Sequence, residues 1–598
     1  MCRRPRWLAV RRDEPVQSLT ARQPPRWTSD AIAELLSRLD LPFISLTPGS
    51  SFRGLHDSLV NHLGNRRPQM LLCLHEEHAV AIAHGYAKVT GRPMAVALHS
   101  NVGLLHASMA IFNAFCDRVP MLVLGATGPV DAARRRPWID WIHTAADQGA
   151  LVREYTKWDD QPASAAAALE AVLRADAVTR AYPSAPVYVC LDAALQEAPL
   201  PPDVAVPSPE RYRPPAPLPP DPATAERVAS LLLGAERPLV LAGRVGRDPG
   251  AWEARTRLAE AVGACVLTDL KTAAAFPTGH ELHPVPPGVF PTPEALDVLR
   301  RADVVLSLDW VDLAGTLRLA HGDADVPAAV ISVSGDAALH GGWSKDHFGL
   351  APADVTIASH PDVVVPELLR HLAGSARPER DWPPARAAAA AARAGGDGIS
   401  MGELAAALRR ALDGRPSCLA RTPLGWHGED WTVSHPLDAI GLEGGAGVGA
   451  GPGLAVGAAL ALADSDRLVV AVMGDGDYLM GASALWTAAR HRLPLLVVVA
   501  NNRSYFNDEV HQQRVALARD RPVENRWVGQ RLDDPAPDLA GMARSLGLEA
   551  HGPVTERADL AAVLCRAAEA AQGGAAVVVD VVVDTADYPG LAGLTREG

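Results

Sequence analysis

Short apolar stretches rich in β-branched residues recur along the chain, and longer stretches with amphipathic helical periodicity separate them. The apolar stretches are nearly continuous in hydrophobic character, which is typical of strands in a parallel sheet that helices cover on both faces. The alternation therefore predicts an α/β fold. Eight segments are predicted to be strands: Ala95–His99, Met121–Leu124, Val187–Leu191, Leu239–Ala242, Val304–Leu308, Leu468–Met473, Leu495–Ala500 and Ala576–Val583.

Two changes in composition divide this pattern into three parts. Eleven prolines lie between Pro199 and Pro222, where neither a helix nor an interior strand would persist. A second break runs from Arg377 through an alanine-rich stretch to Gly396. Because a chain of this length holds about three or four domains, we expect three tandem doubly wound domains with parallel sheets. The predicted boundaries are an extended or disordered N-terminus at 1–27, domains at 28–193, 225–375 and 398–598, and linkers at 194–224 and 376–397.

Composition and charge exclude several classes of protein. Hydrophobic residues make up 48% of the chain and charged residues 21%, which excludes a disordered chain, a collagen-like repeat and a coiled coil. The net charge of −13 predicts no nucleic-acid or anionic-membrane partner. No apolar run reaches the roughly 18–20 residues that a membrane span requires.

The cysteines and the N-terminus bear on the compartment. The seven cysteines lie far apart without a C-x-x-C pair, so we expect no zinc ribbon or disulfide framework and a cytoplasmic location. The N-terminus is basic, but its apolar stretch covers only Trp7–Val10. This is too short for a signal peptide, and we interpret the segment as a transit-like or mis-started extension.

A chemistry-bearing motif lies in the last predicted domain. Gly474-Asp475-Gly476-Asp477-Tyr478 follows one predicted strand, and Asn501-Asn502 ends the next. Ligands of an open parallel sheet bind at the carboxyl ends of its strands. Asp475 and Asn502 offer hard oxygen ligands suited to Mg²⁺, and glycines beside a helix N-terminus let a phosphate approach the backbone. The spacing indicates a metal and phosphate site rather than a plain turn.

The motif resembles the diphosphate–metal motif of thiamine diphosphate enzymes, and more narrowly of the superfamily of acetolactate synthase, pyruvate decarboxylase and benzoylformate decarboxylase. The resemblance implies that Asp475, Asn502 and the backbone carbonyl of Ser504 hold Mg²⁺ or Ca²⁺. It makes the three domains the pyrimidine-binding, central and diphosphate-binding domains. The residues that it assigns to binding of thiamine diphosphate are Gly425, His427, Val448, Gly474, Gly476, Asp477, Tyr478 and Tyr505.

Val448 lies in the glycine-rich segment 444–451, where the family has a bulky residue that forces the cofactor into a bent shape. Valine is smaller than the usual residue, and a merely flexible loop is the alternative interpretation of this segment.

Two adjacent glutamates begin a predicted helix of the first domain. Negative charge is stabilised at such a position by the helix dipole alone. The family signature, counted back from Gly85-Tyr86-Ala87, selects Glu76 as the catalytic glutamate, whereas His84 replaces a glutamate of the family. In the family this carboxyl group hydrogen-bonds the cofactor pyrimidine and promotes loss of the C2 proton, and the cofactor then carries the carbanion chemistry.

The first-domain loops most closely resemble benzoylformate decarboxylase, not acetolactate synthase. Ser50 matches the serine that orients the substrate carboxylate, and His99 matches a histidine that exchanges protons above C2. A structural role is the alternative for His99. His143 brings either acid–base chemistry or a polar rim to the pocket. Asp508 is either a catalytic acid or a charge at a helix start.

The central domain resembles the one that binds FAD in acetolactate synthases. However, Gly243–Gly246 lacks the G-x-G-x-x-G pattern, and Leu308–Asp312 replaces the usual flavin-contacting stretch, so FAD is not expected. Glu76 and Asp475 must both reach one cofactor, and in the family they meet across a subunit interface. We therefore expect a homodimer or homotetramer with the active site at that interface.

The resemblance implies non-oxidative decarboxylation of a 2-oxo acid that depends on thiamine diphosphate and Mg²⁺. The products would be an aldehyde or, by carboligation, an adduct with a second carbonyl compound. An acetolactate synthase-like carboligase and a non-catalytic cofactor-binding paralogue are the alternatives, the latter suggested by Val448 and His84. The missing fingerprint disfavours a third alternative, an NAD-type oxidoreductase. The particular 2-oxo acid depends on a pocket that several loops shape.

Overall fold

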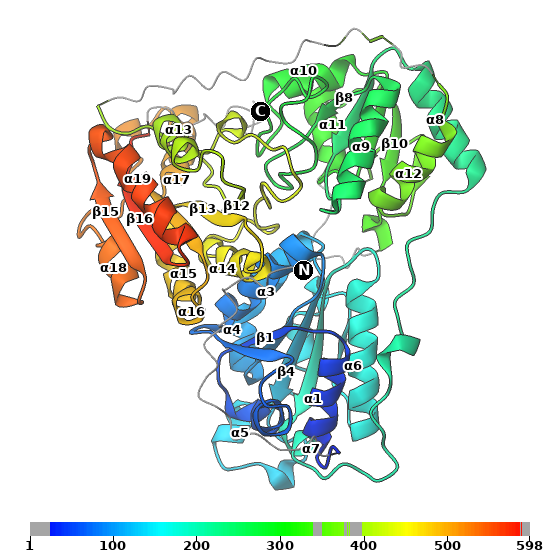
Figure 1. Cartoon of the computed structure of the whole chain (residues 1–598), viewed down its shortest axis with the longest axis vertical. Helices are drawn as coiled ribbons and strands as arrows, with labels where there is room; N and C mark the ends of the chain where they lie inside the picture. The colour runs from blue at the N-terminus through cyan, green and yellow to red at the C-terminus, as the bar shows by residue number, and fades with distance from the viewer. Residues whose placement is uncertain are drawn as a thin grey trace, which may run out of the picture.

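The computed structural model describes residues 24–338, 350–375, 379–380, 382, 397–585 and 588 of the chain. This part contains three parallel sheets, each with helices on both faces (Figure 1). The predicted α/β fold with three parallel-sheet domains is confirmed. Residues 1–23 of the predicted extension, and most of the predicted second linker, lie outside the described residues.

The first sheet has six strands in the order β2-β1-β3-β4-β6-β5. Helices α3 and α4 cover one face, and α1 and α6 cover the other, so that β3, β4 and β6 are buried along their whole length. The strands are β1 (Phe43–Leu46), β2 (Gln69–Leu72), β3 (Ala95–Leu98), β4 (Met121–Thr127), β5 (Asp159–Asp160) and β6 (Pro186–Asp192). The helices are α1 (Thr28–Arg38), α2 (Arg53–Asp57), α3 (Glu76–Thr90), α4 (Ser100–Cys116), α5 (Ile139–Ile142), α6 (Ala165–Arg180) and α7 (Ala193–Gln196).

The proline-rich segment after α7 contains one short 3₁₀ turn, Pro209–Arg211, and runs along the outside of the molecule from the first domain to the central one (Figure 1). The central sheet has the order β11-β10-β9-β7-β8. Its strands are β7 (Pro238–Ala242), β8 (Cys265–Leu267), β9 (Val304–Leu308), β10 (Ala329–Val333) and β11 (Val355–Ile357).

Proline begins four helices of the central domain, directly after a side chain that caps the helix. The ring presets the helical φ, and its missing N–H is not needed in the first turn. Part of the high proline content therefore marks helix starts. These helices are α8 (Pro222–Gly234), α9 (Pro249–Val262), α10 (Pro293–Arg301) and α12 (Pro361–His371); α11 (Leu313–His321) has no such proline.

The last sheet has the order β12-β13-β14-β16-β15, and its central strands are almost wholly buried. The strands are β12 (Ser417–Arg421), β13 (Leu468–Gly474), β14 (Leu495–Asn501), β15 (Glu549–Val554) and β16 (Ala576–Val582). The helices are α13 (Met401–Ala411), α14 (Gly451–Leu462), α15 (Asp475–Gly481), α16 (Leu485–His491), α17 (Phe506–Ala518), α18 (Leu539–Ser545) and α19 (Arg557–Gln572).

The eight predicted strands are all present, with small shifts at their ends. After β13 the chain enters helix α15 directly at Asp475. Glycines at 474 and 476 indicate a turn, because glycine is costly in a helix, but bonds from elsewhere in the domain to Asp477 hold the first turn of α15.

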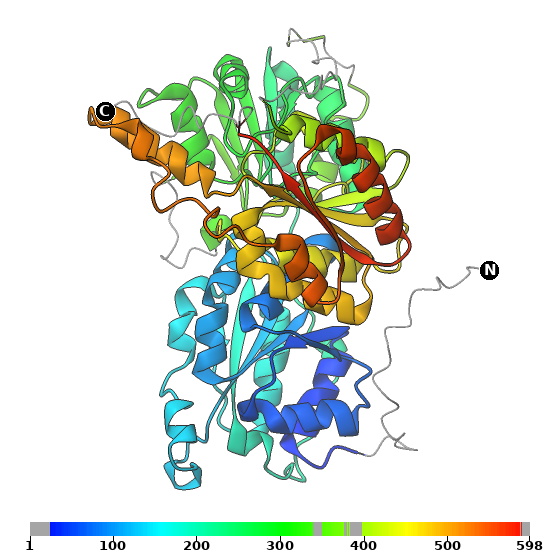
Figure 2. The same cartoon turned by 90° about the vertical axis from the view of Figure 1, so that its left-hand side faces the viewer.

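The first and last domains pack together through α3 and α14, which lie side by side (Figures 1 and 2). The backbones approach closely because glycines face them. A Cβ on Gly85 would lie 2.2 Å from the Leu454 carbonyl oxygen, and one on Gly457 would lie 2.0 Å from that of Ile82. Among the described residues, no helix is long and apolar enough to cross a bilayer.

Candidate functional site

Asp475 lies where β13 meets α15, at the carboxyl edge of the last sheet. Its Oδ1 accepts a hydrogen bond from the Gly476 N–H at 3.0 Å. Its Oδ2 is buried and has no hydrogen-bond partner of normal geometry in the described part of the chain. Burial raises the pKa of Asp475 to about 6, against the lowering effect of nearby backbone N–H groups. A buried acceptor left without a partner is a feature that a bound cation would explain.

The two asparagines at the end of β14 have different surroundings. Asn501 donates to Asp580 Oδ1 at 3.0 Å, so its side chain braces the neighbouring strand β16. Asn502 accepts from the Ser504 N–H at 3.0 Å across a turn in which Arg503 has a φ of +58°. The backbone N–H groups of Arg503 and Ser504 also influence the pKa of Asp475. The structure therefore brings Asp475 and the 502–504 turn together at one edge.

Asp477 is committed to contacts within the protein. Its Oδ1 accepts from the N–H groups of Gly449 at 2.7 Å and Gly451 at 3.2 Å, and its Oδ2 accepts from Arg421 Nε at 2.7 Å. Arg421 is also ion-paired with Glu443. The Asp477 carboxylate therefore holds the glycine-rich segment in place. Only the backbone of Asp477 could contact a cofactor.

The Tyr478 side chain also makes its contacts within the protein core. Its ring is fully buried, and its hydroxyl donates to the Leu539 carbonyl at 3.1 Å. The side chain does not reach the carboxyl edge of the sheet as a free group, and only the backbone of Tyr478 is left for a ligand.

The glycine-rich segment packs against α4 of the first domain. A Cβ on Gly445 would lie 2.6 Å from Asn113 Oδ1, and one on Gly447 would lie 2.6 Å from Met109 Cε. These glycines are therefore explained by close packing, which argues against a merely flexible loop. The Val448 side chain is 42% exposed.

The remaining predicted cofactor residues lie around the same edge. A Cβ on Gly474 would meet nothing within 4 Å, whereas one on Gly476 would collide with the Tyr505 ring at 2.5 Å. Gly425 packs under the Tyr588 ring, and His427 precedes a 3₁₀ turn, where its backbone N–H approaches Asp430 at 3.4 Å.

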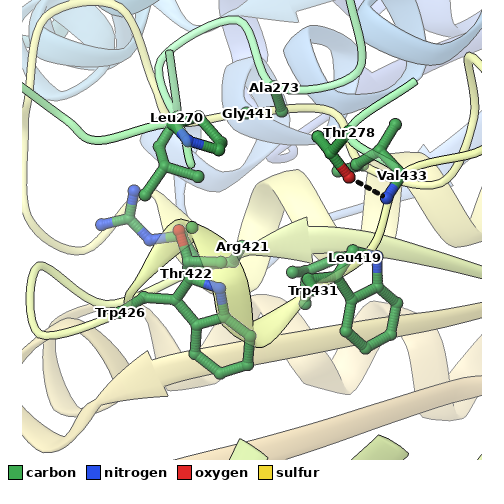
Figure 3. A pocket seen from close by; sticks show the side chains of 13 residues that line it. Leu270, Ala273, Thr278, Leu419, Arg421, Thr422, Trp426, Trp431, Val433 and Gly441 are labelled. Atoms are coloured by element: carbon green, nitrogen blue, oxygen red, sulfur yellow. Dashed lines mark hydrogen bonds between the residues drawn. The ribbon is translucent and has the colours of Figure 1, made fainter. Parts of the chain in front are cut away.

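Trp426 holds the Gly425–His427 loop by packing into a small cavity between the central and last domains (Figure 3). Leu270 and Thr278 of the central domain line the opposite side, and Thr278 accepts a hydrogen bond from the Val433 N–H at 2.9 Å. The cavity is small, with a volume of about 20 Å³. It therefore has no room for a nucleotide and serves as packing behind the loop.

Glu76 is the first residue of α3 and is buried at the carboxyl edge of the first sheet. Gly103 makes room for it, because a Cβ there would lie 3.1 Å from Glu76 Cγ. Glu76 Oε2 lies 3.1 Å from His106 Nδ1, and the His106 ring stacks on His75 at a centroid distance of 4.8 Å. The sequence interpretation missed His106, which lies on α4, the helix that follows His99.

His99 and His143 lie next to each other at this edge, with ring centroids 4.7 Å apart. Burial and the neighbouring His143 lower the pKa of His99, whereas Glu76 raises it. Ser100 Oγ donates to the His143 carbonyl at 2.8 Å, which ties the 143 segment to the start of α4. Of the two serines in the first loop, Ser51 is the one bonded to His99, at 2.9 Å, and Ser50 is exposed.

Family comparisons match all three parts of the chain in order. The descriptions are "Thiamine pyrophosphate enzyme, N-terminal TPP binding domain" for residues 26–151, "central domain" for 225–336 and "C-terminal TPP binding domain" for 425–581. The chain belongs to the thiamine diphosphate-dependent enzymes. The predicted relationship to this superfamily is confirmed.

Relatives among the thiamine diphosphate enzymes carry different activities. A Pseudomonas aeruginosa protein named "Probable 2-ketoarginine decarboxylase AruI" is 27% identical over 51% of this chain and 51% of its own length. The acetolactate synthase large subunit of Corynebacterium glutamicum is 27% identical over 51% of this chain and 49% of its own length. The chain thus spans about half the length of these curated relatives.

A solved structure, benzoylformate decarboxylase from Polynucleobacter necessarius, has a TM-score of 0.75 at 20% identity. The superposition covers 93% of this chain and 99% of the decarboxylase chain. At 20% identity this similarity supports the fold alone.

The donor set at the last sheet fits the metal of a thiamine diphosphate enzyme. The partnerless carboxylate oxygen of Asp475 and the Asn502 side-chain carbonyl are hard oxygen donors. The space beside Gly474 leaves the strand end accessible, and the first backbone N–H groups of α15 face this edge without helical partners.

Proposed function

We propose that the protein decarboxylates a 2-oxo acid without net oxidation, using thiamine diphosphate and Mg²⁺, and releases an aldehyde or joins the remaining fragment to a second carbonyl compound. The observation that carries the proposal is the pairing of His99 with His143 beside the buried Glu76. These two imidazoles provide proton donors and acceptors at the same sheet edge as the glutamate. When bound, thiamine diphosphate supplies the carbanion chemistry.

In this proposal the last domain holds the diphosphate end of the cofactor. Asp475, Asn502 and the Ser504 carbonyl bind the metal, and Gly425, His427 and the first turn of α15 bind the diphosphate. Val448, whose side chain is exposed, supports the bent cofactor from the glycine-rich segment.

The first domain performs the proton transfers. Glu76 hydrogen-bonds the cofactor pyrimidine from its buried position at the start of α3. His99, held by Ser51, and His143 exchange a proton at the reacting carbon. The lowered pKa of His99 makes the neutral imidazole available near pH 7, so that it acts first as an acceptor. Ser50, which is exposed beside this pair, orients the substrate carboxylate.

The central domain takes no part in redox chemistry in this proposal, and FAD is not required. Gly243 is explained by packing, because a Cβ there would lie 2.2 Å from the Asp309 carbonyl oxygen. Arg244 pairs with Asp309 and Asp336, and Arg247 donates to five backbone carbonyls. These cations of the interdomain cleft are thus engaged within the protein.

We also propose a cytoplasmic homodimer or homotetramer, with Glu76 and the metal residues contributed by different subunits. The support is a set of exposed large apolar side chains on the segments that flank Glu76 and on those that carry the predicted cofactor residues, since exposed apolar groups of this kind are typical of interaction surfaces. The six described cysteines are free thiols, which supports the cytoplasmic location. The exposed residues are Leu74, Val102, Leu105, Met109, Val448 and Met480.

A substrate screen tests the proposed function. The purified chain is loaded with thiamine diphosphate and Mg²⁺ and given pyruvate, benzoylformate, branched 2-oxo acids or 2-ketoarginine. Release of CO₂ is measured and the products are identified, with Asp475→Ala as the control that lacks the metal ligand. We expect CO₂ from at least one compound in the wild type and none in the control. Bound cofactor without turnover of any compound would instead support the non-catalytic paralogue.

A further inference from the structure

Three donor side chains of the first domain lie close enough to share one metal ion. His75, Glu76 and His106 each present a donor atom, and the three atoms lie within 4.8 Å of one another. The proposed function uses only Glu76 of this set. Neither histidine belongs to the Asp475 site in the last domain.

The packing of α3 against α4 creates this cluster, because His75 caps α3 and His106 lies two turns into α4. The His75 Nδ1 accepts from the Glu77 N–H at 3.2 Å, which orients the ring and directs Nε2 away from the helix. His106 Nδ1 already contacts Glu76 Oε2 at 3.1 Å. A metal-binding histidine ligates through its unprotonated ring nitrogen and donates the other ring N–H, so a metal on His75 either replaces the Glu77 bond at Nδ1 or requires the proton to move from Nε2 to Nδ1.

The donor chemistry selects the type of metal. Two imidazoles and one carboxylate suit Zn²⁺ and related transition metals, whereas Mg²⁺ and Ca²⁺ prefer oxygen donors alone. Tetrahedral coordination with Zn–N distances of about 2.0–2.1 Å places donors about 3.4 Å apart. The His106–Glu76 distance already meets this spacing. The His106 side chain is 50% exposed, so it can shift toward His75, and solvent has access for a fourth, water ligand.

We propose that His75, Glu76 and His106 bind a divalent transition metal of the Zn²⁺ class in the cofactor-free protein. The metal takes the place of the hydrogen bond between His106 Nδ1 and Glu76 Oε2, and the proton on that ring nitrogen moves to Nε2 or to solvent. If the proposed function holds, the metal and thiamine diphosphate compete for Glu76, because a metal on the Glu76 carboxylate prevents its hydrogen bond to the cofactor. Zn²⁺ thereby acts as an inhibitor that excess Mg²⁺ does not displace.

Direct metal binding tests the site without any catalytic readout. The full chain carrying Asp475→Asn, which removes the other metal site, is freed of metal and titrated with Zn²⁺ against a chromophoric zinc chelator. We expect one tightly bound Zn²⁺ per chain, unaffected by millimolar Mg²⁺. His106→Ala should weaken binding at least tenfold, and His75→Asn, which preserves a helix cap, should do the same.

His551→Ala is the matched control. His551 lies 3.1 Å from Glu549, the same spacing as His106 and Glu76, but has no second histidine beside it in the described chain. Its removal should change Zn²⁺ affinity less than twofold. If His106→Ala binds Zn²⁺ as tightly as its parent, the proposed site is wrong and His106 only positions Glu76.

Cofactor binding separates this proposal from the proposed function. In the chain with Asp475 intact, the apparent dissociation constant of thiamine diphosphate should rise at least tenfold with Zn²⁺ present, and His106→Ala should abolish the rise. If Zn²⁺ binds the cluster but leaves cofactor affinity unchanged, the competition is refuted, and so is the contact between Glu76 and the cofactor, while the metal site stands.

Discussion

Asp477 lies at the centre of a buried network that holds the glycine-rich segment against the first turn of α15. Its three hydrogen bonds connect α15 to Gly449, Gly451 and Arg421. Asp477→Asn preserves the size of the side chain but removes the charge. The amide still accepts from the two glycines through one oxygen, but it places an NH₂ group against Arg421 Nε, where both groups are donors.

The expected cost follows from the burial of this network. Removing one partner of a buried ion pair costs about 3–5 kcal/mol, and a hydrogen bond to a charged group contributes about 1.5–3 kcal/mol. Glu443 still neutralises Arg421 in the variant, so we expect a loss of about 3 kcal/mol, the lower end of this range. For a domain of 150–250 residues, that loss lowers the melting temperature by roughly 6–12 °C.

The assay is thermal unfolding of the cofactor-free chain, followed separately by titration with thiamine diphosphate and Mg²⁺. Asp538→Asn is the control, since Asp538 caps α18 in the same domain and asparagine is as good a cap as aspartate. We expect its melting temperature to stay within about 2 °C of the wild type, which corresponds to roughly 0.5 kcal/mol. An Asp477→Asn chain with the melting temperature of the wild type but a weaker affinity for the cofactor would refute our reasoning. It would show that the Asp477 carboxylate contacts the cofactor.

Three further predictions concern packing, pH and catalysis. Gly85→Ala should cost about 1–3 kcal/mol by overpacking against Leu454, whereas Gly234→Ala, with open space around it, should be neutral or stabilising in the same melting assay. Burial lowers the pKa of His78 to about 4, so the unfolded chain takes up more protons between pH 6.5 and 4 and stability falls as the pH falls through that window. At pH 5 the free energy of unfolding is lower by roughly 2 kcal/mol. Melting curves of His78→Gln should show a smaller decrease with falling pH, and an unchanged pH dependence would contradict this. Glu76→Gln should retain the fold and slow hydrogen–deuterium exchange at C2 of the bound cofactor by about 10²–10⁴-fold, as NMR would measure, and wild-type exchange would remove the role of this carboxyl group.

The strands were predictable because a strand that is buried on both faces of a sheet needs apolar residues at nearly every position. β13 and β14 are continuous runs of apolar residues, and such runs have few alternatives in a chain of this composition. The position of Asp475 and Asn502 at the carboxyl ends of these strands followed from the same reasoning. Both steps depend on neighbours in the sequence, which is why they succeeded.

The contacts of the site were not predictable in this way, because they join segments far apart in the chain. Arg421 meets Asp477 only after β12 and β13 pair in the sheet. Ser51, not Ser50, bonds His99 because of the direction in which the loop turns after β1. His106 reaches Glu76 only because α4 packs beside α3. Periodicity places such residues on an element but does not select their partners.

The glycines around the site show how one residue type serves separate physical needs. Gly85 and Gly457 let two helix backbones approach, and Gly445 and Gly447 let a loop lie on α4. Gly474 is different, since nothing occupies the space where its side chain would be. A glycine with no neighbour at an otherwise crowded sheet edge is not needed for packing, so the space itself is the feature to explain. A ligand that approaches the backbone there accounts for it, and this reasoning supports the placement of the diphosphate independently of the motif.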